Sequence, residues 1–180
     1  MRTLLVIAML GFAPALAAQA PLDTRWQLGV RAGTLIPDSA IDPTDGAIGI
    51  FSLRRALDAD QDIEFEAGFN ELDFGIDYNL RHRFVGVNYV RVNRVPLWDP
   101  YVVVGLGGIR FAAPAGVRSG DSVYASLGVG GRWEIKPDWV YLRVEARMRY
   151  DLVDSDQPGQ DGFGDAVLTV GFEMPLGRKP

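Results

Sequence analysis

Residues 139–150 read Trp-Val-Tyr-Leu-Arg-Val-Glu-Ala-Arg-Met-Arg-Tyr, and this stretch decides the fold of the chain. Every second residue from Val140 to Tyr150 is apolar or aromatic, whereas the residues between them, from Tyr141 to Arg149, are almost all charged. A period of two is typical of a β-strand with two unlike faces, because a helix would mix both sets on every side. One face of this strand therefore meets an apolar medium, and the other carries closely spaced charges of both signs.

Other segments have the same strand character, with turn-forming residues between them. The sequence predicts eight strands, near residues 25–34, 46–55, 61–70, 80–92, 100–111, 122–135, 139–151 and 164–175. The first, third, sixth and eighth repeat the two-faced alternation. The period does not decide the facing of the second and fourth, where a β-bulge would fit. Helical periodicity is absent after the first twenty residues, and no linker divides the chain, so we expect a single all-β domain.

The N-terminus has the features of an export signal. Arg2 supplies a positive charge, and residues 3–16 are mostly apolar but too short to span a bilayer as a helix. Ala15-Leu16-Ala17 is a small-x-small cleavage site. We predict a signal peptide over residues 1–17 and a mature domain over residues 18–180; an uncleaved membrane anchor is the alternative.

The composition excludes several classes of function. The chain has no cysteine, which removes a disulfide framework, a zinc-thiolate centre, a cysteine nucleophile and a lipidated cysteine. The formal net charge is −5, and no segment forms a basic cluster, so we expect no nucleic-acid partner. After the signal, no apolar run reaches the length of a transmembrane helix. A membrane location would therefore require a closed β-barrel, in which every backbone group is paired.

Several features favour a barrel whose apolar face meets lipid over a secreted lipocalin-like barrel with an apolar ligand cavity. The charged faces also carry glycines, such as Gly128 and Gly130, which suit the crowded interior of a narrow barrel. The connections alternate between long loops and short turns, as in outer-membrane barrels whose short turns face the periplasm. No packed helix follows the last strand. The sequence therefore predicts an eight-stranded antiparallel up-and-down transmembrane β-barrel.

The charged faces predict an ionic network inside this barrel. The signs roughly balance, as buried charges must, and a narrow interior filled in this way leaves little open lumen. We therefore expect a plugged barrel rather than a general porin, with at most minor gated ion permeation. The predicted network consists of Arg31, Glu64, Glu66, Arg132, Glu134, Arg143, Glu145, Arg147, Arg149 and Glu173.

All four tryptophans map to the end of the barrel that carries the short turns. Indole rings favour the lipid–water interface, so the sequence predicts an aromatic girdle on the periplasmic side. The alternative is a set of ordinary core or rim tryptophans. The predicted girdle consists of Trp26, Trp98, Trp133 and Trp139.

Five segments, in their order along the chain, resemble the OmpA-type transmembrane barrel of Gram-negative outer membranes. They are DYNLRH at 77–82, PYVVVGLGG at 100–108, GVGGRWE at 128–134, VEARMRY at 144–150 and TVGFEMPL at 169–176. The resemblance covers essentially the whole mature chain. It implies a small monomeric outer-membrane protein with a structural or surface-interaction role, no catalysis and no cofactor or metal. The implied partners are outer-membrane lipid, lipopolysaccharide and the barrel-assembly machinery.

The last of these segments resembles the strand that the barrel-assembly machinery recognises, through Thr169, Gly171, Met174 and Leu176. The chain departs from the family in ending on Gly177-Arg-Lys-Pro180 instead of an aromatic residue. We also expect no periplasmic peptidoglycan-binding domain, so the resemblance does not imply anchoring to the cell wall.

A lipid A-modifying barrel enzyme is the alternative function. His82 is the only histidine, so any Ser-His-Asp or metal–His mechanism must use it. No serine stands at a recognisable spacing from it, and we expect a solvated histidine at the loop-end rim. Arg81, Arg83 and Arg118 lie where they could contact lipopolysaccharide phosphates.

Two further motifs have simpler explanations. Residues 154–165 faintly resemble a calcium loop, but Pro158 stands where such a loop needs a ligand, and we expect an acidic surface loop. Gly105-x-Gly107-Gly108 lies within a predicted strand, which favours close packing at the barrel wall over a dinucleotide site.

Overall fold

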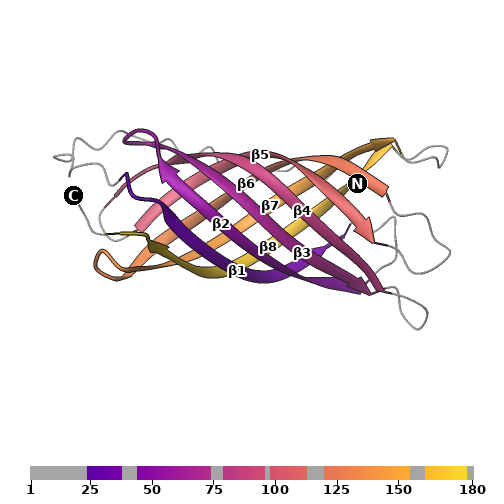
Figure 1. Cartoon of the computed structure of the whole chain (residues 1–180), viewed down its shortest axis with the longest axis horizontal. Helices are drawn as coiled ribbons and strands as arrows, with labels where there is room; N and C mark the ends of the chain where they lie inside the picture. Colours follow the sequence, from indigo (N-terminus) through magenta and orange to yellow (C-terminus); the bar gives the residue numbers. More distant parts are fainter. Residues whose placement is uncertain are drawn as a thin grey trace, which may run out of the picture.

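Eight antiparallel strands close into a barrel in which each strand pairs with its neighbours in sequence and the last pairs with the first (Figure 1). The computed structural model describes residues 24–37, 44–73, 79–95, 98–112, 120–154 and 161–177. The strands are β1 (Gln27–Ile36), β2 (Thr44–Ala56), β3 (Gln61–Asp73), β4 (Asn79–Val92), β5 (Trp98–Ala112), β6 (Gly120–Lys136), β7 (Val140–Asp154) and β8 (Asp161–Pro175). The predicted fold class is confirmed.

All eight predicted strands are present, and several continue further toward the loop end than the sequence indicated. β3 continues to Asp73 and β7 to Asp154, and β8 begins as early as Asp161. Each of these extensions contains an aspartate, Asp73, Asp154 or Asp161, a residue that is more typical of loops than of strands. Neighbouring strands nevertheless supply partners for their backbone groups, which outweighs the weak strand propensity of the side chains.

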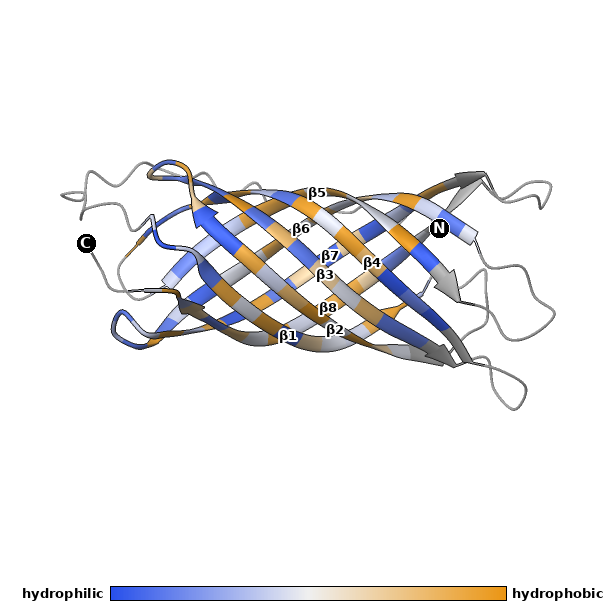
Figure 2. Ribbon diagram, viewed as in Figure 1, coloured by the Kyte–Doolittle hydropathy of each residue, from blue (hydrophilic) through white to orange (hydrophobic). Residues whose placement is uncertain are grey.

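The two faces of the wall are reversed relative to a soluble protein. Figure 2 shows hydrophobic and hydrophilic residues alternating along the strands. Apolar outward side chains remain exposed, for example Phe51 at 53%, Leu106 at 61% and Phe172 at 56%. Arg31 and Arg143, in contrast, are buried inside the barrel. Soluble monomers rarely expose an apolar surface of this extent, and a bilayer would cover it.

β2 and β4 carry apolar side chains on both faces, which explains why their facing could not be read from the period. In β2, Ile50 and Arg54 point inward and Phe51 points outward. In β4, Phe84 points inward while Val85 points outward. A register shift between Thr44 and Ala47 marks the loop end of β2, where the sequence had allowed for a bulge.

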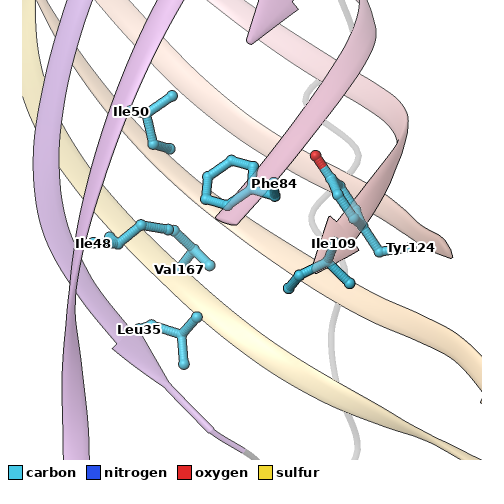
Figure 3. Packing of buried hydrophobic residues seen from close by; sticks show 7 residues of the cluster. All are labelled: Leu35, Ile48, Ile50, Phe84, Ile109, Tyr124 and Val167. Carbon is cyan, nitrogen blue, oxygen red and sulfur yellow. The ribbon is translucent and has the colours of Figure 1, made fainter. Parts of the chain in front are cut away.

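Seven inward apolar residues gather into a layer toward the loop end of the barrel, and a second cluster on β4 and β5, Val90, Val92, Tyr101 and Val103, lies nearer the turn end. Figure 3 shows the side chains of the seven pointing toward one another across the interior. They come from β1, β2, β4, β5, β6 and β8, so the layer draws on most of the wall. We refer to this set as the apolar layer; it consists of Leu35, Ile48, Ile50, Phe84, Ile109, Tyr124 and Val167. The sequence predicted an interior of charges interleaved with glycines, and the apolar layer as a unit was missed.

The adjacent glycines 107 and 108 test which face of β5 is crowded. A Cβ on Gly107 would lie 2.5 Å from Cε1 of Tyr124, whereas a Cβ on Gly108 would meet only the Ser122 carbonyl oxygen at 3.8 Å. We expect Gly107→Ala to lower the free energy of unfolding by about 1–3 kcal/mol, because the added methyl overpacks the interior. We expect Gly108→Ala to change it by less than about 0.5 kcal/mol. Urea unfolding in lipid vesicles measures both, and equal effects would contradict the assigned faces.

Candidate functional site: an ionic network in the barrel

Buried ion pairs fill the middle of the barrel. Four arginines and four glutamates from β1, β2, β3, β7 and β8 contact one another there, and each is at most 7% exposed. We call this set the central network; it consists of Arg31, Arg54, Arg143, Arg147, Glu64, Glu66, Glu145 and Glu173. Its formal charges balance, which is the condition for keeping charges away from water.

Arg143 on β7 lies at the centre of this network. Its Nη1 donates to Glu64 and, at 2.5 Å, to Oε1 of Glu173, and its Nη2 donates to Oε2 of Glu145 at 2.5 Å. Its Nε donates to the hydroxyl of Tyr101 at 2.6 Å, and this hydroxyl donates in turn to Glu145 at 2.9 Å. The guanidinium also lies 4.9 Å from the centroid of the Tyr101 ring. One side chain thus donates charge-assisted hydrogen bonds to three carboxylates from three strands.

Arg31 and Arg147 complete the network on the loop side of Arg143. Arg31 Nη1 donates to Oε1 of Glu145 at 2.6 Å, and its Nη2 donates to Oε1 of Glu64 at 3.1 Å. Arg147 Nη1 donates to Oε1 of Glu66 at 2.8 Å, and its Nη2 donates to Glu145 at 2.7 Å. Glu145 therefore accepts from three arginines, and loss of any one of them leaves its carboxylate partly paired.

The network continues toward the turn end. Arg54 pairs with Asp62 at 2.7 Å, and Arg94, beyond β4, reaches the same carboxylate at 2.5 Å. Arg132 pairs with Asp99 at 2.5 Å and approaches Glu173 at 3.7 Å, which links it to the central network.

Arg149 belongs to a separate ion pair on the loop side. Its Nη2 lies 2.7 Å from Oδ2 of Asp165, and its Nε lies 3.9 Å from Oδ1 of Asp151. Its guanidinium lies 5.8 Å from the ring centroid of Phe84 and 5.7 Å from that of Tyr124. The cation therefore packs against the apolar layer, where aromatic faces favour a positive charge.

The predicted placement of Glu134 in the network is wrong, because the structure places this side chain outside the barrel interior. Its side chain is exposed at the end of β6, where it accepts from the backbone N–H of Asp138 at 2.7 Å and from the hydroxyl of Tyr141 at 3.4 Å. The β6–β7 register shifts between Glu134 and Lys136, and Asp138 has a φ of 58°. The alternation of inward and outward residues along β6 continues to Glu134, which already lies beyond the barrel interior. Its carboxylate therefore bonds to the β6–β7 turn instead of to the network.

Sequence reasoning also missed residues that the network needs. Arg54 and Tyr101 contact its charges directly, and Asn88 donates to Glu64 at 3.2 Å. Tyr124 donates to Glu66 at 3.2 Å. The signal for Arg54 was the alternation of Ser52 and Arg54 with apolar neighbours in the second half of β2. The alternation of β6 puts Tyr124 on the charged face, but Tyr101 gave no comparable signal, because an aromatic residue suits either face.

His82 is not the solvated rim histidine that the sequence suggested. It is 5% exposed, and its Nδ1 lies 3.0 Å from Nδ2 of Asn70 inside the barrel. The residues of β4 with even numbers face the interior, which explains the burial. A lipid lying against the outer wall would not reach this imidazole.

The tryptophans lie at the turn end, as their strand positions require. Trp26 immediately precedes β1, and Trp139 lies in the β6–β7 turn, 57% exposed. Trp98 and Trp133 stack across the β5–β6 pair with ring centroids 5.6 Å apart. Their role at a lipid interface stays a prediction.

The residues of the proposed assembly signal lie on both faces of β8 and immediately after its end at Pro175. Thr169 and Gly171 are buried inside the barrel, whereas Met174 and Leu176 are exposed on the outside. Several other predictions fall outside the described residues. They are the signal peptide at 1–17, Arg118, and residues 155–160 of the supposed calcium loop.

A wall of eight antiparallel strands with an apolar exterior and a charged interior defines the class of small eight-stranded transmembrane barrels. No helix in the described part of the chain is long and apolar enough to cross a bilayer. No family model matches the sequence, and no curated protein matches it significantly.

Solved outer-membrane barrels match the structure. Neisserial surface protein A has a TM-score of 0.70 at 13% identity, covering 84% of this chain and 97% of its own. The N-terminal barrel of Pseudomonas aeruginosa OprF has a TM-score of 0.53 at 16% identity, covering 82% of this chain and 97% of its own. The outer membrane enzyme PagL has a TM-score of 0.52 at 13% identity, covering 83% of this chain and 99% of its own. At these identities the likeness shows the fold alone.

Arg143→Ala tests the central position of this side chain. We expect the substitution to lower the free energy of unfolding by about 3–5 kcal/mol, because three buried carboxylates lose a shared partner. The measurement is urea unfolding in lipid vesicles, followed by tryptophan fluorescence.

Arg91→Ala on the outer wall is the control, because its ion pair with Asp60 at 3.3 Å is solvent-exposed, with side chains 72% and 43% accessible. Its loss should cost at most about 1 kcal/mol. Similar small losses for both variants would show that the network does not support the barrel.

Proposed function

We propose that this chain is an exported, OmpA-type outer-membrane barrel with a sealed interior and a structural or surface-interaction role. The observation that carries the proposal is the combination of an exposed apolar wall with an interior of paired charges. The wall suits a bilayer, and the filled interior suits neither a ligand-binding cavity nor an open channel. This argument also disfavours the lipocalin-like alternative, which needs an apolar cavity.

Two barriers in series support a sealed interior. The central network occupies the middle of the barrel with charges that are already paired, so a passing ion gains little by displacing them. The apolar layer lies between this network and the loop end, and a narrow apolar constriction excludes water and ions. In this proposal, ion permeation requires both barriers to rearrange and is therefore rare and small.

Planar-bilayer recording tests the two barriers. We expect rare, small currents from the wild type, and similar currents from Arg143→Ala, because the apolar layer still excludes water. Phe84→Ala combined with Arg143→Ala should raise the open probability well above either single variant. Each variant is first checked for heat-modifiable migration on a detergent gel, which reports a folded barrel. Porin-sized currents from the wild type would refute the sealed interior, and opening by Arg143→Ala alone would make the network the only gate.

The second candidate is a lipid A-modifying enzyme, because one structural neighbour is described as an outer membrane enzyme. The placement of His82 argues against it here. The imidazole is buried beside Asn70 within the barrel, whereas acyl chains lie along the outer wall. A triad also needs a serine in contact with the base, whereas the contact described for the His82 ring is with the side-chain amide of Asn70.

Lipid A profiles test the enzyme. We expect the same lipid A species by mass spectrometry from cells with the protein, without it, and with His82→Ala, because the imidazole is buried inside the barrel, away from lipid on the outer wall. A change in acylation that depends on the protein and is abolished by His82→Ala would establish the enzyme instead.

Export and assembly complete the proposal. The signal peptide at 1–17 would direct the chain out of the cytoplasm, and the last strand would present Met174 and Leu176 to the barrel-assembly machinery. The tryptophans at the turn end would then lie at the periplasmic interface, which places the long loops at the cell surface.

A further inference from the structure

Exposed charges on the outer wall gather at the loop end of β3 to β6. Arg81, Arg83 and Arg110 contribute three positive charges, and Glu71 and Asp121 contribute two negative ones. The next outward residues toward the barrel middle are apolar and exposed. They include Phe69 at 57%, Val85 at 63% and Val123 at 55%; on β5, Leu106 at 61% follows beyond Gly108. The charges therefore mark the edge of the apolar band, at the depth where lipid headgroups begin.

Two of these arginines stand directly opposite each other. Arg83 on β4 pairs in register with Arg110 on β5, and both side chains point outward. Directly opposite residues on one face have Cβ atoms about 4.5–5.5 Å apart, and like charges at this spacing repel each other. Arg110 is partly neutralised by Asp121, with bonds of 2.7 and 3.1 Å. Within the described residues, Arg83 forms no ion pair, so the pair retains excess positive charge.

We propose that Arg83 and Arg110 bind a phosphate of lipid A in the leaflet on the loop side. Guanidinium groups donate paired hydrogen bonds that match the geometry of phosphate oxygens. Arg83 supplies a full positive charge, and Arg110 keeps its Nη1 outside the two bonds to Asp121. The apolar residues beneath them would lie along the acyl chains of the same lipid. This inference rests on the proposed function, because the loop side faces lipopolysaccharide only if the barrel is inserted with its short turns in the periplasm.

The opposite rim of the same strand lacks this arrangement. Arg91, at the turn end of β4, pairs with Asp60 at 3.3 Å, and the outward residue opposite it on β5 is Val102. Arg83 and Arg91 are both exposed on β4, but their environments differ. Arg83 faces a second arginine, whereas Arg91 faces a carboxylate and an apolar residue. Arg91→Gln removes the same charge from the same strand and is the matched control.

The test is lipid binding to the folded full chain in detergent, measured by native mass spectrometry with diphosphorylated lipid A. We expect Arg83→Gln combined with Arg110→Gln to weaken binding by about tenfold or more, because charge-assisted hydrogen bonds are lost. Arg91→Gln should bind as the wild type does. Removing both phosphates from lipid A should weaken its binding to the wild type. The loss should be about as large as the loss that the double variant shows with diphosphorylated lipid A.

Three results would overturn the inference: equal affinity of wild type and double variant, equal loss in Arg91→Gln, or equal binding of phosphatidylglycerol, which would assign the site to phospholipid. The double variant removes only exposed charges, so it should fold, and heat-modifiable migration checks this. Bilayer recording of the same wild-type sample separates the two proposals. A closed, folded barrel without selective lipid A binding refutes only the lipid site, whereas a barrel that conducts freely refutes the proposed function.

Discussion

Arg143 can be buried only because carboxylates from other strands meet it inside the closed barrel. Glu64 comes from β3 and Glu173 from β8, and β3 is not a neighbour of β7 in the wall. A charge of this kind in an unclosed sheet would face either lipid or water, and only closure brings its partners within reach. The central network therefore links strands that share no backbone hydrogen bonds, and its formation is coupled to closure of the wall.

The apolar layer and the central network depend on each other. Ion pairs are strengthened where water is excluded, and the apolar side chains toward the loop end provide that exclusion. Arg149 illustrates the boundary, because its guanidinium pairs with Asp165 and also packs on Phe84 and Tyr124. The interior is thus a small protein core in which charges occupy the middle, apolar groups pack toward the loop end, and a second apolar cluster lies on β4 and β5 nearer the turn end.

Sequence reasoning succeeded where the two faces of a strand differ in chemistry and failed where they do not. β7 alternates between apolar and charged residues along most of its length, so its facing followed directly from the period. β2 and β4 could not be oriented, because Ile50 and Phe84 serve the apolar layer inside while Phe51 and Val85 face outward. Glu134 continued the pattern of β6 past the point where the strand leaves the barrel. Periodicity describes a face of a strand but does not indicate where the barrel ends.

The structural neighbours share 13–16% of residues with this chain, although they share its fold. A wall of alternating strands tolerates almost any apolar residue outside, so most wall positions carry little information about function. Charges inside the barrel are explained by the need to fill and neutralise the interior. Exposed arginines at the edge of the apolar band have no such explanation, because the fold would close without Arg83. Residues that the fold does not require are therefore the best place to look for what distinguishes this barrel from others of its class.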